Sequence, residues 1–204
     1  MMASRRLLLF GSVVGLLAAG SGYWLYRRNT GPVFEPDNEV CVVAPTFAYD
    51  PASGLPPTVA REVPAQARCP VCGMFPARKR NWAAQVIFRD GHVQYLDSPL
   101  SLFHYLQQVP RYTTGRRATD IAAVYVSDQV SGQWLDADQA VYVHGSALLG
   151  PMRSGNLPAF ASLAQAKAFI RQKGGVPMSA TQLRQGLPEN LQQLAPHSHA
   201  PAQP

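Results

Sequence analysis

The sequence predicts an α+β fold of two small strand–strand–helix units, preceded by an N-terminal transmembrane helix. Three observations predict this fold. An uncharged apolar run lies near the N-terminus, a hairpin signal is followed by a helix start, and strand patterns followed by a helix start then occur a second time. Because no helix separates the paired strands, the sequence does not predict a doubly wound parallel sheet.

The apolar run at residues 7–26 predicts a membrane-spanning helix. Its twenty residues carry no charge, and an arginine pair flanks it on each side, Arg5-Arg6 and Arg27-Arg28. At about 1.5 Å per residue, such a helix matches a hydrocarbon core of roughly 30 Å. The free amino group and the acidic residues beyond Arg28 place the N-terminus in the cytoplasm and the rest of the chain outside it. We therefore interpret residues 1–28 as an uncleaved membrane anchor.

Two other interpretations of this segment remain open. Small residues at Ala18, Gly20 and Gly22 suit the cleavage site of a signal peptide. Residues 4–9 are similar to a twin-arginine export signal, although the usual Phe and Lys are missing. The apolar region of a signal peptide usually holds about 7–15 residues, and here the run continues past the small residues, which favours the anchor.

Composition divides the remaining chain into three parts. Residues 29–66 hold seven prolines and a net charge of −4, which predict an extended acidic linker with one short strand at 40–43. Residues 67–186 predict a folded core with a net charge of +7, and residues 187–204 predict a disordered tail. The net charge of the whole chain is +6, but no aromatic residues follow a basic stripe. The sequence therefore argues against a nucleic-acid partner.

The first unit begins with two predicted strands, at residues 82–88 and 93–96. Asp90-Gly91 between them is a strong hairpin signal. A helix follows, because Ser98 is a suitable N-cap and Pro99 suits the first helical position. Pro110 ends this helix.

The second unit repeats the pattern. Strands are predicted at residues 123–127, 133–135 and 140–144. A helix then begins at Ser162 and ends at Gly174-Gly175, and Ser179 is a suitable cap for a short third helix. The two units together predict the α+β class, with a possible duplication of one motif.

The most informative stretch for function is Cys69-Pro70-Val71-Cys72-Gly73-Met74. Four interpretations compete for it. The cysteine pair suits a thiol–disulfide oxidoreductase, although Gly73 and Pro76 oppose the helix that would lower the thiol pKa. It also suits half of a structural zinc site or a structural disulfide. The candidates to complete the zinc site are Cys41, His92, His104 and His144. The disulfide would join Cys69 to Cys72, or one of these two residues to Cys41.

The fourth interpretation is a site for a soft metal ion. Cu(I) prefers thiolate and thioether ligands. Cys72 and Met74 are two residues apart, so an extended backbone directs both side chains to the same side. Met152, in a loop between a strand and the second helix, is the best candidate for a third sulfur ligand. Outside the cytoplasm thiols tend to oxidise, so Cys69 would be either an oxidation hazard for Cys72 or a control on its redox state.

The core resembles the NosL-type family of nitrous oxide reductase accessory proteins. The resemblance covers residues 67–183 in order, and it is specific as a set although each motif is short. The motifs that carry it are Cys69-x-x-Cys72-Gly73-Met74, residues 95–99, 124–128, 134–137 and 140–143, Pro151-Met152, Ala159-Phe160, and Ala168-Phe169 running to Gly174-Gly175.

The resemblance implies a membrane-tethered periplasmic chaperone that binds Cu(I). It implies Cys72, Met74 and Met152 as metal ligands, and Cys69 matches an upstream position that is frequent in the family. The implied partners are apo-nitrous oxide reductase or its assembly complex, together with the inner membrane through the single N-terminal helix. Many family members carry a lipid on a cysteine directly after the signal. Here the first cysteine, Cys41, follows no lipobox, so the helix at residues 7–26 takes the place of the lipid.

No catalytic arrangement is evident in the sequence. We find no nucleophile elbow, no paired carboxylates in helical register and no phosphate-binding loop, so we expect no enzymatic activity. The alternative function is a membrane-tethered thiol–disulfide oxidoreductase that uses Cys69 and Cys72.

Overall fold

The computed structural model describes residues 44–153 and 156–193. The predicted membrane helix at residues 7–26, Cys41 and residues 194–204 of the tail lie outside this part. Among the described residues, no helix has the length and apolar character needed to cross a membrane.

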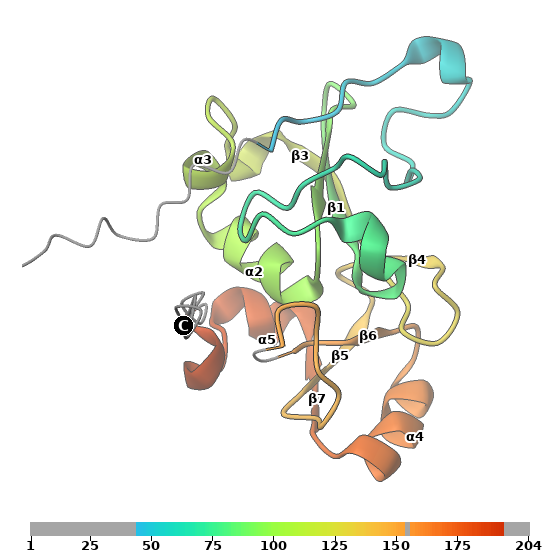
Figure 1. The fold of residues 1–204 in the computed structure, drawn as a ribbon, viewed down its shortest axis with the longest axis vertical. Coiled ribbons are helices and arrows are strands. Elements are labelled where there is room, and N and C mark those ends of the chain that lie inside the picture. Colours follow the sequence, from blue (N-terminus) through green and yellow to red (C-terminus); the bar gives the residue numbers. More distant parts are fainter. Residues whose placement is uncertain (1–43, 154–155, 194–204) are drawn as a thin grey trace, which may run out of the picture. The chain divides into compact units, whose positions relative to one another are not determined.

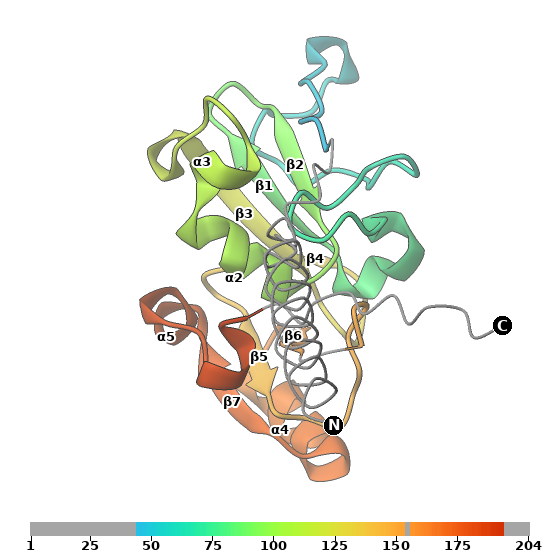
Figure 2. The same ribbon diagram turned by 60° about the vertical axis from the view of Figure 1, so that its left-hand side comes forward.

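The described chain folds around two small antiparallel sheets (Figure 1). The first has the strand order β2-β1-β3-β4 and the second has the order β6-β5-β7. Figure 2 shows β2, β1 and β3 of the first sheet side by side. The strands are β1 (Ala84–Phe88), β2 (Val93–Leu96), β3 (Ile121–Ser127), β4 (Trp134–Asp136), β5 (Val141–His144), β6 (Ala159–Phe160) and β7 (Val176–Ser179).

Helices surround these sheets. Ser98, Ser162 and Ser179 each accept a backbone N–H through the side chain and so begin three of the helices, as the sequence predicts. The α-helices are α2 (Pro99–Gln107), α3 (Val109–Tyr112), α4 (Leu163–Lys173) and α5 (Ala180–Gln185). Short 3-10 segments are η1 (Pro51–Ser53), η2 (Pro76–Trp82), η3 (Ala118–Asp120) and η4 (Glu189–Leu191).

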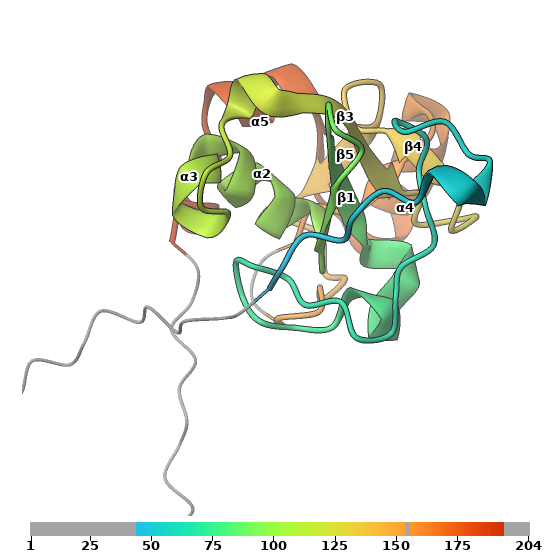
Figure 3. The ribbon, with the colours of Figure 1, turned by 90° about the horizontal axis from the view of Figure 1, so that it is seen from above.

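The first sheet is covered on both faces. Alternate residues of β1 belong to two different apolar clusters: Val86 and Phe88 pack in the main core with α2, whereas Ile87 packs in a second cluster with Val93 and Tyr95. Viewed from above, α2 and α3 lie on one side of β1 (Figure 3). Phe47, Val63 and Ala67 of the preceding chain pack in the second cluster with Ile87. Every residue of β1 and β2 is therefore buried.

Residues 44–66 take part in this cover. Phe47 exchanges two backbone hydrogen bonds with Val93, at 2.8 and 2.9 Å. The Arg61 backbone N–H donates to Gln85 Oε1 at 3.0 Å, and Gln85 Nε2 donates to the Arg61 carbonyl at 3.1 Å. We expected this segment to act as an extended tether, but the described part of it packs on the core, because the second apolar face of the sheet needs cover.

The C-terminal segment also differs from the expectation of a disordered tail after residue 186. Leu187 and Leu191 are buried, and the Leu191 carbonyl pairs with His104 Nε2 at 2.8 Å. Residues 187–193 therefore pack against α2, because two leucines at this spacing bury apolar area on the core.

The mixed α+β fold with two small antiparallel sheets agrees with the predicted class, but the strands are divided differently from the prediction. We placed the strand at 123–127 in the second unit, whereas β3 pairs with β1 in the first sheet. β1 is apolar on both faces, so it occupies the middle of a sheet and needs a neighbour on each edge. β5 instead pairs with β6 and with β7, an edge strand that contains Pro177 and that the sequence did not predict.

Candidate metal centre

The loop at residues 69–74 is held by its own backbone. The Cys69 carbonyl accepts a hydrogen bond from the Gly73 N–H, and the Cys69 N–H donates to the Met74 carbonyl, each at 2.8 Å. Gly73 has a φ of 74°, a conformation that a residue with a Cβ rarely adopts. The next helical segment, η2, begins only at Pro76, so the cysteine pair does not lie at a helix N-terminus.

Two residues of this loop and one residue after β2 bring three potential ligand atoms together. The sulfurs of Cys69 and Cys72 and a carboxylate oxygen of Asp97 lie within 4.8 Å of one another. Asp97 follows β2 and directly precedes Ser98, the N-cap of α2. Cys69 and Asp97 are buried, whereas Cys72 is partly exposed.

Cys72 is oriented by polar contacts. Its thiol donates to Asp97 Oδ1 at 3.1 Å, and Ser101 Oγ on the first turn of α2 lies 4.0 Å from its sulfur. The hydrogen bond with the Cys69 sulfur raises the pKa of the Cys72 thiol, and burial and the neighbouring Asp97 carboxylate raise it further. Cys72 is therefore a protonated thiol at neutral pH when no metal is bound, and both cysteines are free thiols.

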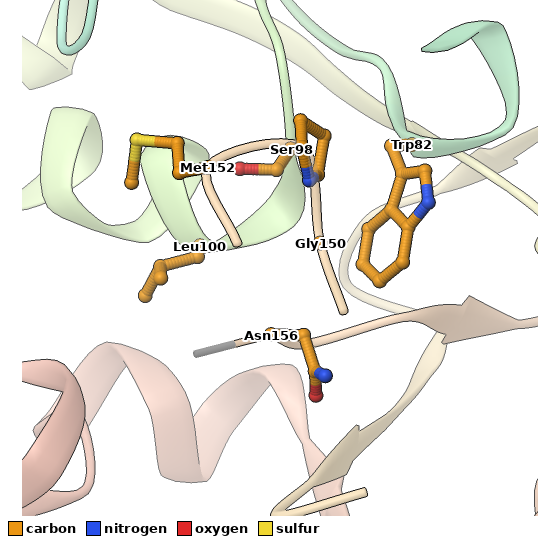
Figure 4. Close-up of a pocket in the computed structure, with 7 residues that line it drawn as sticks. Trp82, Ser98, Leu100, Gly150, Met152 and Asn156 are labelled. Atoms are coloured by element: carbon orange, nitrogen blue, oxygen red, sulfur yellow. The ribbon is translucent and has the colours of Figure 1, made fainter. Parts of the chain in front are cut away.

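Met152 lies in a neighbouring pocket on the loop between β5 and β6. Figure 4 shows its side chain beside Leu100 and Ser98, with Trp82 and Asn156 also on the pocket wall. Met152 and Cys72 are both partly buried, and both pack against the main apolar core. The first turn of α2 contributes to both positions, because Ser98 and Leu100 line the pocket and Ser101 faces Cys72.

The sulfur residues singled out in the sequence thus come from two loops. Cys69 and Cys72 are brought together directly in the three-residue cluster. Met74 is partly exposed and follows Gly73 in the same loop. Met152 comes from the loop of the second sheet and lies in the adjoining pocket.

The histidines considered for a zinc site point to other partners. His92 pairs with Asp90, with 2.9 Å between Nδ1 and Oδ2. His104 is buried against Leu191, and His144 Nε2 lies 3.0 Å from Asn190 Oδ1. None of them belongs to the thiol cluster within residues 44–153 and 156–193, which argues against a zinc site completed by histidine.

Asp97 is the site residue that the sequence did not single out. A carboxylate directly before an N-cap is ordinarily interpreted as part of the helix start, because acidic residues are common near helix N-termini. Its contact with Cys72 depends on how residues 69–74 cover the end of β2, which is a non-local feature. The one available signal was a single charge between two apolar elements, β2 and α2.

Comparison with known proteins matches most of the described core. The family model described as NosL matches residues 60–187. The crystal structure of the copper chaperone NosL from Shewanella denitrificans is similar, with a TM-score of 0.51 and 24% sequence identity, over 62% of this chain and 96% of that chain. At this identity, the likeness concerns the fold. No match was found among curated proteins.

Proposed function

This chain belongs to the NosL family, and from that premise we propose that it is a membrane-anchored periplasmic chaperone that binds Cu(I) and delivers copper for the maturation of nitrous oxide reductase. The observation that carries the proposal is the pair of free thiols in the 69–74 loop, inside the segment that the family model matches. The copper ion is the cargo of such a protein rather than a resident cofactor.

We assign the copper ligands to Cys72, Met74 and Met152, with the buried Cys69 close to Cys72. A thiolate and two thioethers carry one negative charge, which Cu(I) neutralises, so a bound ion leaves no net charge in a partly buried site. Soft sulfur ligands in low number suit Cu(I) and leave one side of the ion open to a ligand of the acceptor. Copper then passes by ligand exchange, without release of the free ion.

The exposures of the two cysteines give this transfer a direction. Cys69 is fully buried, whereas Cys72 is partly exposed, so an acceptor approaches from the side of Cys72. Two basic residues flank the loop in sequence. The guanidinium groups of Arg68 and Arg78 lie 4.4 and 4.6 Å from the centre of the Phe75 ring. These cations favour an acceptor with an acidic surface, and the acceptor that we propose is apo-nitrous oxide reductase or its assembly complex.

The thiol–disulfide oxidoreductase alternative has less support. Such an enzyme needs an accessible thiolate with a lowered pKa, which a helix N-terminus usually provides. In this chain the pKa of the Cys72 thiol is raised, and Cys69 is buried. Both features oppose attack on a disulfide substrate.

The proposed function is tested by titrating the reduced full-length chain with Cu(I) against a chromophoric chelator. We expect one Cu(I) per chain, bound more tightly than by the chelator, and weaker binding in Met74→Leu and Met152→Leu. Leu187→Met, which adds a buried thioether at the far end of the core sequence, is a control that should leave the copper affinity unchanged. Parent-like copper binding in both methionine variants would contradict the ligand assignment, and no Cu(I) binding by the parent would contradict the function.

A further inference from the structure

We propose that a cleft formed by η2 and the loop at residues 149–153 docks an acidic segment of a partner protein, in which carboxylates flank an apolar side chain. The cleft has a volume of about 310 Å³, at the lower end of the range for binding pockets. None of Cys69, Cys72 and Asp97 lines it, so it is separate from the thiol cluster. The lining residues are Lys79, Trp82, Leu149, Gly150, Pro151 and Arg153.

The two cations of the cleft are free to bind an anion. Within the basic run at residues 78–80, Arg78 lies over an aromatic ring and Arg80 pairs with Glu62. Lys79 lines the cleft instead, and so does Arg153. Neither of these two forms an ion pair with a carboxylate among residues 44–153 and 156–193. No acidic residue lines the cleft, so its positive charge is available to carboxylates from another molecule.

Both cations stand on irregular backbone. Lys79 has a φ of −136° and a ψ of 62°, which interrupts η2. Arg153 has a φ of 59°, an unfavourable conformation for a residue with a Cβ. Conformations of this kind concentrate at functional sites. The chain thus departs from regular geometry at the two positions that place a cation at the cleft.

The remaining wall of the cleft is largely apolar. Trp82 is only 5% exposed, whereas Leu149 is 58% exposed. A single exposed leucine is ordinary on a protein surface, but this one shares a cleft with Pro151 and the Trp82 indole. Tryptophan and arginine are frequent anchors of protein interfaces. An apolar side chain of the partner can therefore bury area here while its neighbouring carboxylates meet Lys79 and Arg153.

The charge of the cleft also decides between a foreign partner and a second copy of this chain. The folded core at residues 67–186 has a net charge of +7, so a second copy would bring further positive charge to a cleft that already holds two cations. Like charges brought together at an interface oppose association. A foreign acidic segment is the better complement.

The cleft adjoins the pocket that holds Met152. Trp82, Gly150 and Pro151 line both of them, and Met152 lies between two cleft residues in the sequence. A segment docked in the cleft therefore lies beside this candidate copper ligand. The partner that this position favours is the copper acceptor. That identification rests on the proposed function, whereas the acidic character of the docked segment does not.

The test uses a fluorescein-labelled peptide, Glu-Asp-Leu-Glu-Asp, as the probe. It is titrated with the metal-free full-length chain in a neutral detergent at low ionic strength, and fluorescence anisotropy measures the affinity. We expect saturable binding that weakens with added salt, because exposed charges are screened. A peptide with lysine at the four acidic positions should not bind.

Variants of the lining residues locate the peptide. Lys79→Glu and Arg153→Glu each replace an attraction by a repulsion, and we expect each to weaken peptide binding by about 5–30-fold. Leu149→Ser removes apolar contact area, and we expect a loss of about 3–10-fold. The matched controls are Lys167→Glu on α4 and Val130→Ser, which make the same changes at exposed positions outside the cleft and should bind the peptide like the parent.

Three results would overturn the proposal. One is a parent chain without saturable peptide binding, and another is equal peptide affinity in Lys79→Glu and Lys167→Glu. The third concerns the acidic residues of the chain itself, at positions 35, 37 and 39. If their combined replacement by the corresponding amides raised peptide affinity tenfold or more, the cleft would belong to this segment and not to a partner. All of these measurements are made without copper, so the Cu(I) titration decides the proposed function separately.

Discussion

Two edge strands, β2 of the first sheet and β7 of the second, differ sharply in burial. β2, at the edge of the first sheet, is buried along its whole length, because residues 44–66 cover one face and α2 the other. In β7, at the edge of the second sheet, only Met178 is partly buried. Regions with few buried apolar contacts open at a lower free energy than the core. β2 is therefore held more firmly than β7.

This difference coincides with the division of the candidate ligands. Asp97 directly follows β2 and lies with the two thiols, whereas Met152 belongs to the loop between β5 and β6 of the second sheet. That loop also carries Arg153 at a φ of 59°, an unfavourable conformation for a side chain with a Cβ. Under the proposed function, a carrier gains from this arrangement, since the thiolate and the Met152 thioether come from different sheets, so the thioether can be released while the thiolate still holds copper.

The largest expected effect is on copper affinity. Cys72→Ser removes the anionic soft ligand, and we expect Cu(I) affinity to fall by about 1,000-fold or more, at least about 4 kcal/mol. Met152→Leu removes a neutral thioether from the loop between β5 and β6, and we expect a loss of about tenfold in Cu(I) affinity, near 1.4 kcal/mol. Chelator competition on both variants measures the ratio. Equal losses of Cu(I) affinity would mean that Cys72 and Met152 contribute equally to copper binding.

The burial contrast is tested by one substitution made in both edge strands. Val93→Ala in β2 removes fully buried methyl groups, and we expect a loss of about 2–3 kcal/mol in the free energy of unfolding. Val176→Ala in β7 changes a side chain that is 55% exposed, and we expect a change within about 0.5 kcal/mol. Denaturant unfolding of the metal-free chains measures both values. A similar loss in the two variants would mean that the second sheet is as well packed as the first.

Local features of this fold were predictable from the sequence, but its non-local pairings were not. Asp90-Gly91 correctly predicted the hairpin, and Ser98, Ser162 and Ser179 correctly predicted helix starts, because turns and caps depend on neighbouring residues. The pairing of β3 with β1 depends on burial across the whole sheet, so an apparent repeat suggested a different division of the strands.

The candidate site follows the same rule. Cys69 and Cys72 were recognisable from their spacing within one loop, and their proximity is local. Asp97 joins them across 25 residues of chain, through contacts that no local pattern describes. The sequence indicated Met152 as a candidate sulfur ligand, but its placement near the first turn of α2 rests on the packing of the two sheets, which no local pattern describes.

The backbone conformation of the loop at residues 69–74 is tested by Gly73→Ala. Because Gly73 has a φ of 74°, a Cβ there should destabilise the chain by about 1–2 kcal/mol. We also expect weaker metal binding, because the substitution disturbs the loop that holds both cysteines. Gly186→Ala is the matched control, since its φ is 171° and an added Cβ meets no atom within 4 Å. If Gly73→Ala unfolds at the same denaturant concentration as Gly186→Ala, the positive φ of Gly73 does not require a glycine for stability.

The smallest expected effect concerns pH and the contact between α2 and residues 187–193. Burial lowers the pKa of His104 below its ordinary value of 6.5, against a smaller opposing effect of its contact with the Leu191 carbonyl. The unfolded chain therefore takes up a proton at this residue before the folded chain does, so the stability present above pH 6.5 declines as the pH falls below it. One group can contribute a slope of no more than about 1.4 kcal/mol per pH unit. Denaturant unfolding between pH 5 and 8 should show this decline in the parent and a shallower one in His104→Gln, whose side-chain amide can still donate to the Leu191 carbonyl. Identical slopes in the two proteins would mean that His104 titrates in the folded chain as it does in the unfolded one, and that the C-terminal segment leaves it open to water.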